Sequence, residues 1–409
     1  MSNPERTAHS RPAPPTLDRL MVVTLGATAL QAYDPATGGM ALRLPPAQLL
    51  QQALAALSAA GHAVRAELTA LPQRSGAELT MTTLCAVRDL VLQRLKDGGC
   101  SAVVLLCGTD TLEDAAFSLH LMLADALRDR RTLLCITGAM LPADQLGGDG
   151  ARNLRDALRV ASDPGVRGAA AGQVLVVLND NIHLAQYVFK ADSQLPGAFR
   201  SHPGPLGQLR GGTPVLYYAP PPPQATQSSA AASAPAEAQH AQQHPGAHPP
   251  WLPRPEFRRL PAAALARHVA IWPLTVDGQP PPEALLSLLD GLVLAGSGTG
   301  SLPASVVDAL AGPSASAGGV SSSSGREASE GDGTGGSCSE GSCRPWTSRL
   351  PIVISSRCHW GSNHDDFCYK GSLAKYEGRG FVLRGGYEQL NPLQARTLLA
   401  LRLAAFGRA

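Results

Sequence analysis

Two hydroxyls and a carboxylate stand together at Thr109, Asp110 and Thr111, directly after a glycine that ends an apolar run. The run, residues 102–107, is uninterrupted, which is typical of a strand buried on both faces of a parallel sheet. A segment with helical spacing begins at Leu112. Polar side chains between such a strand and a helix start can bind a ligand, and free backbone N–H groups there can stabilise an oxyanion. The simpler alternative is that Thr109 or Asp110 only caps the helix.

The same order of apolar strand and polar turn recurs along the chain. Five more apolar runs end in Gly, Asn or Ser, at 21–25, 133–137, 174–178, 292–295 and 352–354. Helical patterns lie between the runs, at 47–60, 82–96, 112–127, 150–161, 282–289 and 392–406. Strands that alternate with amphipathic helices favour βαβ units and a doubly wound parallel sheet. The sequence therefore predicts an α/β fold.

The length and composition of the chain indicate its domain organisation. With 409 residues, 44% of them hydrophobic, the chain can bury a large core and is expected to form two domains. We expect a catalytic N-terminal domain at 20–218 and a smaller α/β C-terminal domain at 263–409. The remaining segments are predicted to be a disordered tail at 1–19, a Pro- and Ala-rich linker at 219–262 and a disordered Ser- and Gly-rich insertion at 312–347.

Charge and hydropathy argue against several kinds of partner. A net charge of +2 with 16% charged residues gives no electrostatic reason to expect binding to nucleic acid or to a membrane surface. No apolar run approaches the roughly 20 residues that span a bilayer. Residues 1–19 lack the apolar core of a secretory signal, and the 8 cysteines follow no disulfide spacing. We therefore expect a cytoplasmic protein.

Several stretches of the chain match motifs that occur together in one known family. Residues 107–113 read CGTDTLE, close to HGTDTLEE, and 137–142 with 149–154 are similar to TGAMRP and DGPxNL. Residues 176–180 followed by Lys190 are similar to VLVVLND and TK. Further matches lie at 204–207, 291–296, 355–357 and 390–396. Over about residues 22–403, apart from the two inserted segments, the chain resembles the bacterial-type L-asparaginases of the asparaginase/glutaminase family.

This resemblance implies an amidohydrolase that converts L-asparagine and water to L-aspartate and ammonia through a threonine acyl-enzyme. It puts the primary nucleophile at Thr28, with Tyr33 in the following loop as its assistant. It also groups Thr109, Asp110 and Lys190, so that the lysine activates Thr109 or the deacylating water, and Asp110 pairs with the substrate ammonium group. Burial lowers the proton affinity of such a lysine, whereas the Asp110 carboxylate raises it. Backbone N–H groups near Thr28 and Thr109 are the expected oxyanion donors.

The chain departs from the family pattern at several positions. Ala27 replaces the second glycine of a TGGT turn, which is harmless only if its φ stays negative. Cys107 replaces the signature histidine, and Thr299 and Ser301 stand where many members carry asparagine. An ungapped alignment puts Gly76, rather than Ser75, at the serine that binds the substrate carboxylate. The expected substrate-binding residues are Ser75, Gly76, Gly108, Thr109, Asp110 and Ala139.

The resemblance implies no cofactor and a homo-oligomer, either a homotetramer or a homodimer, because family members usually form active sites between subunits. The substrate is L-asparagine or also L-glutamine, and a glutaminase-asparaginase of mixed specificity is the first alternative. A catalytically weakened amino-acid-binding homologue is the second, and a subunit of a tRNA-dependent amidotransferase is a weaker third. Residues 358–368 carry two Cys, two His and two Asp, but their spacing fits no metal motif, so no metal site is expected.

Overall fold

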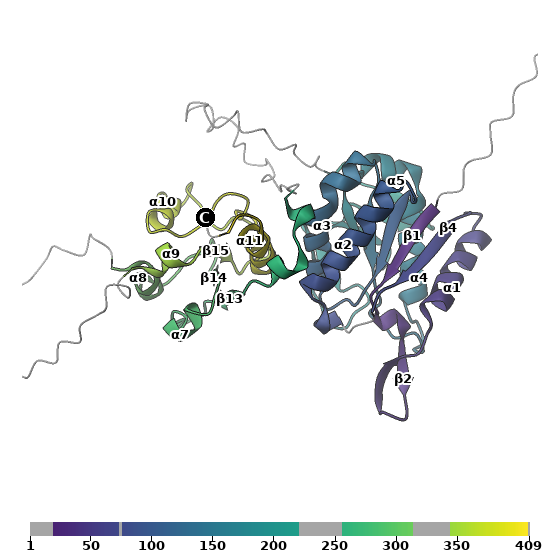
Figure 1. Cartoon of the computed structure of the whole chain (residues 1–409), viewed down its shortest axis with the longest axis horizontal. Helices are drawn as coiled ribbons and strands as arrows, with labels where there is room; N and C mark the ends of the chain where they lie inside the picture. The colour runs from purple at the N-terminus through teal and green to yellow at the C-terminus, as the bar shows by residue number, and fades with distance from the viewer. Residues whose placement is uncertain (1–18, 73–75, 221–255, 314–343, 408–409) are drawn as a thin grey trace, which may run out of the picture.

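The computed structural model describes residues 19–72, 76–220, 256–313 and 344–407, which form two α/β domains side by side (Figure 1). Apart from Arg19, which begins the first strand, the predicted tail lies outside these ranges, as do most of the predicted linker and insertion. None of the helices within them combines the length and apolar character that crossing a membrane requires.

The N-terminal domain is built on an eight-stranded sheet in the order β12-β11-β8-β7-β6-β5-β1-β4. Its parallel part consists of β1 (Arg19–Thr24), β4 (Arg65–Ala70), β5 (Ala102–Leu106), β6 (Leu134–Thr137) and β7 (Val174–Leu178). Antiparallel pairing extends it through β8 (Asn181–Leu184), β11 (Gly207–Arg210) and β12 (Thr213–Leu216). The residues of β5, β6 and β7 are all buried, as expected of strands with helices on both faces.

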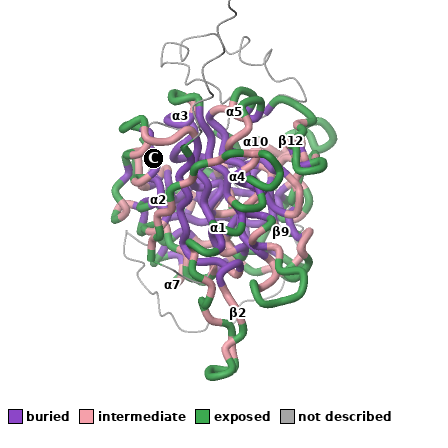
Figure 2. The backbone as a smooth tube through the Cα atoms, turned by 90° about the vertical axis from the view of Figure 1, so that its right-hand side faces the viewer, coloured by how far each residue is buried: buried purple, intermediate pink, exposed green. Residues whose placement is uncertain are grey.

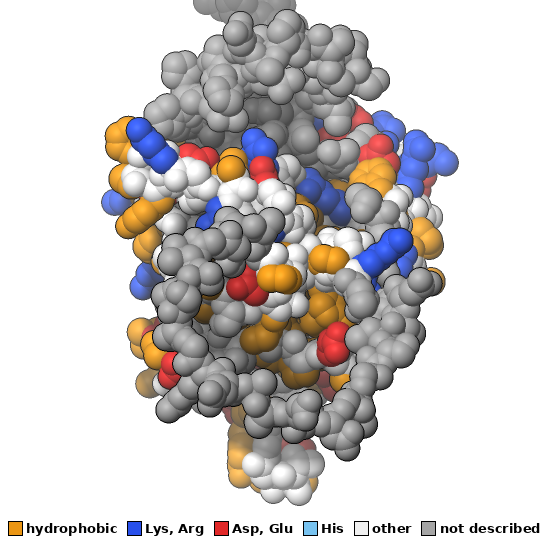
Figure 3. Space-filling model, turned by 90° about the vertical axis from the view of Figure 1, so that its left-hand side faces the viewer, with side chains coloured by type: hydrophobic (Ala, Val, Ile, Leu, Met, Phe, Trp, Pro, Cys, Tyr) orange, Lys and Arg blue, Asp and Glu red, His pale blue; other side chains and the backbone are white. Residues whose placement is uncertain are grey.

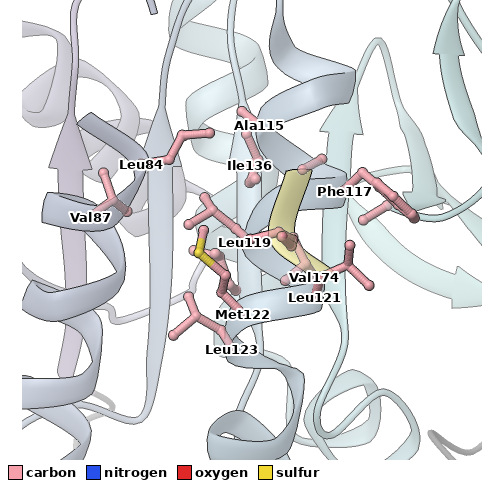
Figure 4. Close-up of a cluster of buried hydrophobic side chains, with 14 of the residues drawn as sticks. Leu84, Val87, Ala115, Phe117, Leu119, Leu121, Met122, Leu123, Ile136 and Val174 are labelled. Carbon is pink, nitrogen blue, oxygen red and sulfur yellow. The ribbon is translucent and has the colours of Figure 1, made fainter. Parts of the chain in front are cut away.

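Two pairs of helices cover the two faces of this sheet (Figure 1). Helices α1 (Pro46–Ala59) and α4 (Gly150–Ser162) pack on one face, and α2 (Met81–Lys96) and α3 (Leu112–Asp129) on the other. Figure 4 shows Leu84 of α2, Leu119 of α3 and Ile136 of β6 within one cluster of buried hydrophobic side chains. A short helix, α5 (Pro164–Ala169), follows α4. The predicted doubly wound parallel sheet is thus confirmed.

The strand order of the parallel part reverses between β1 and β5. From β1 the chain adds β4 on one side, and β5, β6 and β7 follow on the other. Because these strands are parallel, their carboxyl ends lie at one edge of the sheet, and the loops after β1 and β5 are neighbours there. Ligands bind at such topological switch points in open α/β sheets.

The smaller C-terminal domain has a parallel three-stranded sheet in the order β13-β14-β15. Its strands are β13 (Val269–Pro273), β14 (Gly291–Gly296) and β15 (Ile352–Ser356). Helix α11 (Pro392–Phe406) covers one face and packs on α3, so it joins the cores of the two domains. The other face is covered by α7 (Glu283–Leu286), α8 (Ala304–Ala311), α9 (Trp346–Arg349) and α10 (Ser372–Glu377).

Parts of the predicted linker and insertion belong to the fold. Phe257, in a 3-10 turn at Phe257–Arg259, is fully buried against α3, and Trp346 is buried in the core of the C-terminal domain. Each aromatic side chain supplies apolar surface that the Pro-, Ser- and Gly-rich residues near it lack. The predicted linker is therefore wrong over 256–262, and the predicted insertion is wrong over 344–347.

Two short antiparallel pairs lie outside the main sheets. The first, β2 (Gln31–Asp34) with β3 (Gly39–Leu42), forms a hairpin that extends away from the body and is mostly exposed or half-buried (Figures 1 and 2). The second joins β9 (Val188–Lys190) to β10 (Phe199–Ser201). On the side shown in Figure 3, basic and acidic side chains are interspersed among hydrophobic ones, in keeping with the small net charge.

Candidate active site

A lysine, a threonine and an aspartate meet at the carboxyl edge of the large sheet. Lys190 Nζ lies 3.1 Å from Thr109 Oγ1 and 2.9 Å from Asp110 Oδ1. Thr109 and Asp110 occupy the turn between β5 and α3, and Lys190 is the last residue of β9. The Lys190 side chain is 15% exposed, whereas that of Asp110 is 65% exposed. The lysine is therefore largely enclosed, while the carboxylate remains open to a ligand.

These three groups can move a proton and hold a cation. The Lys190 ammonium donates to the Thr109 hydroxyl oxygen, and the same nitrogen, when neutral, can accept a proton from that hydroxyl. Thr109 itself is buried, with 5% of its surface exposed. Because Asp110 reaches solvent, its carboxylate can also pair with a positively charged ligand group.

Two glycines bring separate segments together beside this group. A Cβ on Gly108 would lie 2.7 Å from Gly76 Cα, so both backbones can approach only because the residue is glycine. A Cβ on Gly76 would lie 3.4 Å from Asp110 Oδ2. The Thr111 hydroxyl donates to the Gly76 carbonyl at 2.7 Å and holds the two segments in place. Gly76 and Gly108 thus lie at the site, whereas Ser75 lies outside the described residues.

The turn after β6 forms the next part of this edge. A Cβ on Gly138 would lie 3.0 Å from Thr109 Cγ2. Asn153 Nδ2 donates to the Gly138 carbonyl at 3.0 Å and to Asp149 Oδ2 at 2.9 Å, and Asp149 Oδ1 accepts the N–H of Leu141 at 2.9 Å. Ala139 has no exposed surface and packs in the core. A direct contact between Ala139 and substrate therefore requires this turn to change.

Thr28 lies in the loop after β1, next to the loop that carries Thr109. The Leu25 N–H donates to the Leu106 carbonyl at 3.0 Å and continues the pairing of β1 with β5 to the start of both loops. Gly26 has a φ of +91°, which favours glycine, whereas Ala27 is extended with a φ of −159°. The alanine in place of the family glycine is thus compatible with this turn. Thr28 is half-buried and begins a 3-10 turn, Thr28–Leu30.

Tyr33 lies on the projecting β2–β3 hairpin (Figure 1). Its side chain is 55% exposed, and its backbone N–H donates to Asp144 Oδ2 at 2.8 Å. No hydrogen bond between described residues connects Tyr33 with Thr109 or Lys190. The structure therefore brings Thr109, Asp110, Lys190, Gly76 and Gly108 together, puts Thr28 in the neighbouring loop, and leaves Tyr33 apart.

Glu113 was not identified from the sequence as a site residue. Its Oε2 accepts the backbone N–H of Lys190 at 2.6 Å. Burial is the main cause that raises the pKa of Glu113 to about 7, and its hydrogen bond with Lys190 opposes this rise. The sequence signal that could have found it is its place in the same signature, one turn after Thr109 and Asp110.

The unusual residue at position 107 has no reactive role in this arrangement. Cys107 is buried at the end of the β5 run, and burial raises the pKa of its thiol to about 12. A thiol with such a pKa stays protonated and packs as a small apolar side chain. Cys107 therefore contributes to packing beneath Thr109.

The C-terminal domain contributes a cavity and an aromatic contact. Thr299 and Ser301 line a cavity of about 560 Å³ in this domain. The ring of His359 stacks on Phe189, the residue before Lys190, with 4.6 Å between the ring centroids. Trp360 extends this contact, with its ring edge toward Phe189 and stacked on His202. Within the described ranges, which include all of 358–368, no group of three or more His, Cys, Asp or Glu is arranged to hold a metal ion.

The chain is similar to known proteins of one family. Residues 19–222 match the model of the N-terminal domain of asparaginases. A protein named "Probable L-asparaginase" from Deinococcus radiodurans is 30% identical over 302 residues, which cover 73% of this chain and 77% of that protein. The chain belongs to the asparaginase family. As a family member it is a hydrolase of the amidohydrolase class.

Other asparaginases share shorter stretches or the fold. L-asparaginase 2 of Bacillus subtilis is 37% identical over 99 residues, which are 24% of each chain. A glutaminase-asparaginase of Pseudomonas aeruginosa is 33% identical over 118 residues, covering 29% of this chain and 30% of that protein. The crystal structure of a "Probable Cytoplasmic L-asparaginase" from Campylobacter jejuni superposes with a TM-score of 0.65 at 20% identity and covers 96% of both chains. This likeness extends the shared fold to both domains.

Proposed function

We propose that this asparaginase hydrolyses the side-chain amide of L-asparagine, giving L-aspartate and ammonia through a threonyl ester. The observation that carries the proposal is the contact of one lysine nitrogen with both Thr109 Oγ1 and Asp110 Oδ1. A proton carrier next to a hydroxyl, beside an open carboxylate, is what hydrolysis of an amino-acid amide needs.

The first half of the reaction forms the ester. The Thr28 hydroxyl oxygen attacks the amide carbon of the substrate, the C–N bond breaks, and the hydroxyl proton leaves with the nitrogen as ammonia. Thr28 follows the strand at which the strand order reverses, and its loop lies beside the loop of Thr109. This position supports Thr28 as the nucleophile. Backbone N–H groups of the two loops stabilise the oxyanion.

The second half releases the product. Lys190 and Thr109 take a proton from water, the water oxygen attacks the ester carbon, and the proton returns to Thr28 as its C–O bond breaks. Throughout the reaction, Asp110 holds the substrate ammonium group. Its 65% exposure leaves a carboxylate oxygen for this contact while Oδ1 is paired with Lys190.

A mixed glutaminase-asparaginase is the second candidate function. Relatives with that name, from Pseudomonas aeruginosa and Acinetobacter glutaminasificans, are 33% and 35% identical to this chain over 118 and 131 residues. The same groups can act on an amide one methylene further from the α-carbon. Turnover of the two amides therefore separates the candidates.

We also propose a homodimer or homotetramer and a cytoplasmic location. The similar Campylobacter jejuni protein, which is named a probable cytoplasmic L-asparaginase, supports the location. Sedimentation of the purified protein tests the assembly: a single species with the mass of one chain would contradict it.

Ammonia release from L-asparagine and L-glutamine tests the function. We expect the parent protein to release ammonia, and Thr28→Ala and Thr109→Val each to lose at least about 100-fold in kcat. Thr213→Val, which alters an exposed threonine on β12 at the opposite end of the sheet, is the matched control and should keep the parent rate. Equal rates in all four proteins would remove both threonine roles. Calorimetric binding of aspartate without ammonia release would instead favour an amino-acid-binding homologue.

A further inference from the structure

Lys190 is held at two places by residues from one turn of the chain. Its side-chain nitrogen contacts Thr109 and Asp110, and its backbone N–H donates to Glu113 Oε2 at 2.6 Å. Thr109 and Asp110 immediately precede α3, and Glu113 is the second residue of this helix. The start of α3 therefore contacts both ends of the same lysine residue.

The strand that carries Lys190 is short, and Lys190 is its last residue. β9 has three residues and pairs with β10 in a two-stranded sheet that is separate from the eight-stranded one. Val188 and Phe199 of this pair are buried in the core, but two strands of three residues have little stability of their own. By contrast, Glu113 belongs to a helix of 18 residues that is buried along most of its length. The hydrogen bond from Lys190 to Glu113 thus connects a short strand, β9, to a long and mostly buried helix, α3.

We propose that Glu113 is a positioning residue for Lys190: its carboxyl group fixes the lysine backbone so that the amine reaches Thr109 and Asp110. The inference rests on the proposed function for its catalytic consequence. Glu113 acts through Lys190.

The surroundings of Glu113 fit this role. A partly buried carboxyl group needs a donor, and the N–H of Lys190 supplies one at a short distance. Glu113 is half-buried, and this burial raises the pKa of its carboxyl group. Asp114 beside it lies near Arg396 of α11, so Asp114 has a separate electrostatic neighbour. Glu113 therefore has Lys190 as its hydrogen-bond partner across the domain.

Substitutions at position 113 can separate the hydrogen bond from the charge. Glu113→Gln keeps an oxygen at the same length and removes the charge, whereas Glu113→Ala removes the acceptor. Asp129→Asn, at the exposed far end of α3, is the control for the loss of a carboxylate from this helix. Two readouts apply: the hydrogen exchange of the Lys190 amide, and kcat with KM for ammonia release.

In Glu113→Ala we expect the Lys190 amide to exchange at least about tenfold faster and kcat to fall at least about tenfold, with KM within about threefold of the parent. Glu113→Gln and Asp129→Asn should keep slow exchange and most of kcat. Unchanged exchange in Glu113→Ala, or an equal loss in Glu113→Gln, would overturn the inference. If Glu113→Ala does not fold, Glu113→Asp takes its place, because its carboxylate is one methylene too short and the same faster exchange is expected.

The exchange readout does not depend on turnover. If the parent releases no ammonia while Glu113→Ala exchanges faster, the proposed function fails and the anchoring of Lys190 stands. If the parent is active and Glu113→Ala matches it in exchange and kcat, the positioning role alone fails.

Discussion

Lys190 and Asp110 form an ion pair with 2.9 Å between Nζ and Oδ1, although 80 positions separate them in the sequence. The carboxylate is largely exposed, and ion pairs of this kind contribute at most about 1 kcal/mol to folding. The pair therefore matters more for the orientation of the amine than for the stability of the fold.

Replacement of Lys190 by Met keeps an unbranched side chain that is one atom shorter and removes the amine. We expect kcat for ammonia release to fall at least about 100-fold, because Thr109 loses its proton carrier. The free energy of unfolding in urea should change by no more than about 1 kcal/mol. Lys96→Met, at the exposed end of α2, is the control and should leave both quantities at the parent value. A Lys190→Met protein with the parent kcat would contradict the assignment.

Gly108→Ala tests the close approach of two backbones at the site. The added Cβ would lie 2.7 Å from Gly76 Cα, so one segment must move by about an ångström. Because Thr109 follows directly, we expect kcat to fall about 100-fold and the protein to lose about 1–3 kcal/mol of stability. Gly168→Ala serves as the control, since a Cβ there meets nothing within 4 Å. Parent-like kinetics for Gly108→Ala would show that the site tolerates the shift.

Ala27→Gly restores the residue that the family carries in the first turn. Ala27 is extended and 4% exposed, so the change removes a buried methyl group and gains no needed backbone freedom. We predict a loss of about 1–2 kcal/mol in the free energy of unfolding with little change in kcat. Ala36→Gly, in an exposed turn, should cost less. A large gain in kcat would mean that the alanine restrains the turn of Thr28.

Glu113 should make the stability of the protein depend on pH. Burial raises its folded pKa from 4.5 to about 7, so its contribution to stability is full below pH 4.5 and is lost as the pH rises through about 7. The effect amounts to about 3 kcal/mol at most. We predict that Glu113→Gln lacks this loss, so the difference between its unfolding free energy and that of the parent changes over this range.

Urea titrations from pH 4.5 to 8 measure this difference. His120 and His183 act in the opposite sense, because burial lowers the pKa of each to about 4 and stability is lost as the pH falls below 6.5. Both histidines are present in the two proteins, so their effects cancel in the comparison. If the unfolding free energies of the parent and of Glu113→Gln change with pH in the same way, the prediction is contradicted.

The sheet could be predicted because the residue types of its strands indicate how deeply each strand is buried. Long apolar runs such as 102–107 indicate burial on both faces, and the polar residues after them mark the binding edge. Thr109, Asp110 and Lys190 were grouped by their motifs, and the structure brings the three together.

Other features depend on contacts that no local pattern shows. A glutamate in the first turn of a helix is common because it favours the helix dipole. The place of Glu113 in the signature points to the site, but nothing near it in the sequence shows that it contacts β9. The structural roles of Phe257 and Trp346 were hidden by the low-complexity residues beside them. The position of Tyr33 on a projecting hairpin depends on how that hairpin packs, and residue spacing does not encode this.

The stack of His359 on Phe189 ties the C-terminal half of the molecule to the residue that precedes the reactive amine. A change in how the two halves pack would displace that ring and, with it, the backbone next to Lys190. On the proposed function, we therefore expect substitutions at this stack, although remote from the threonines, to change turnover.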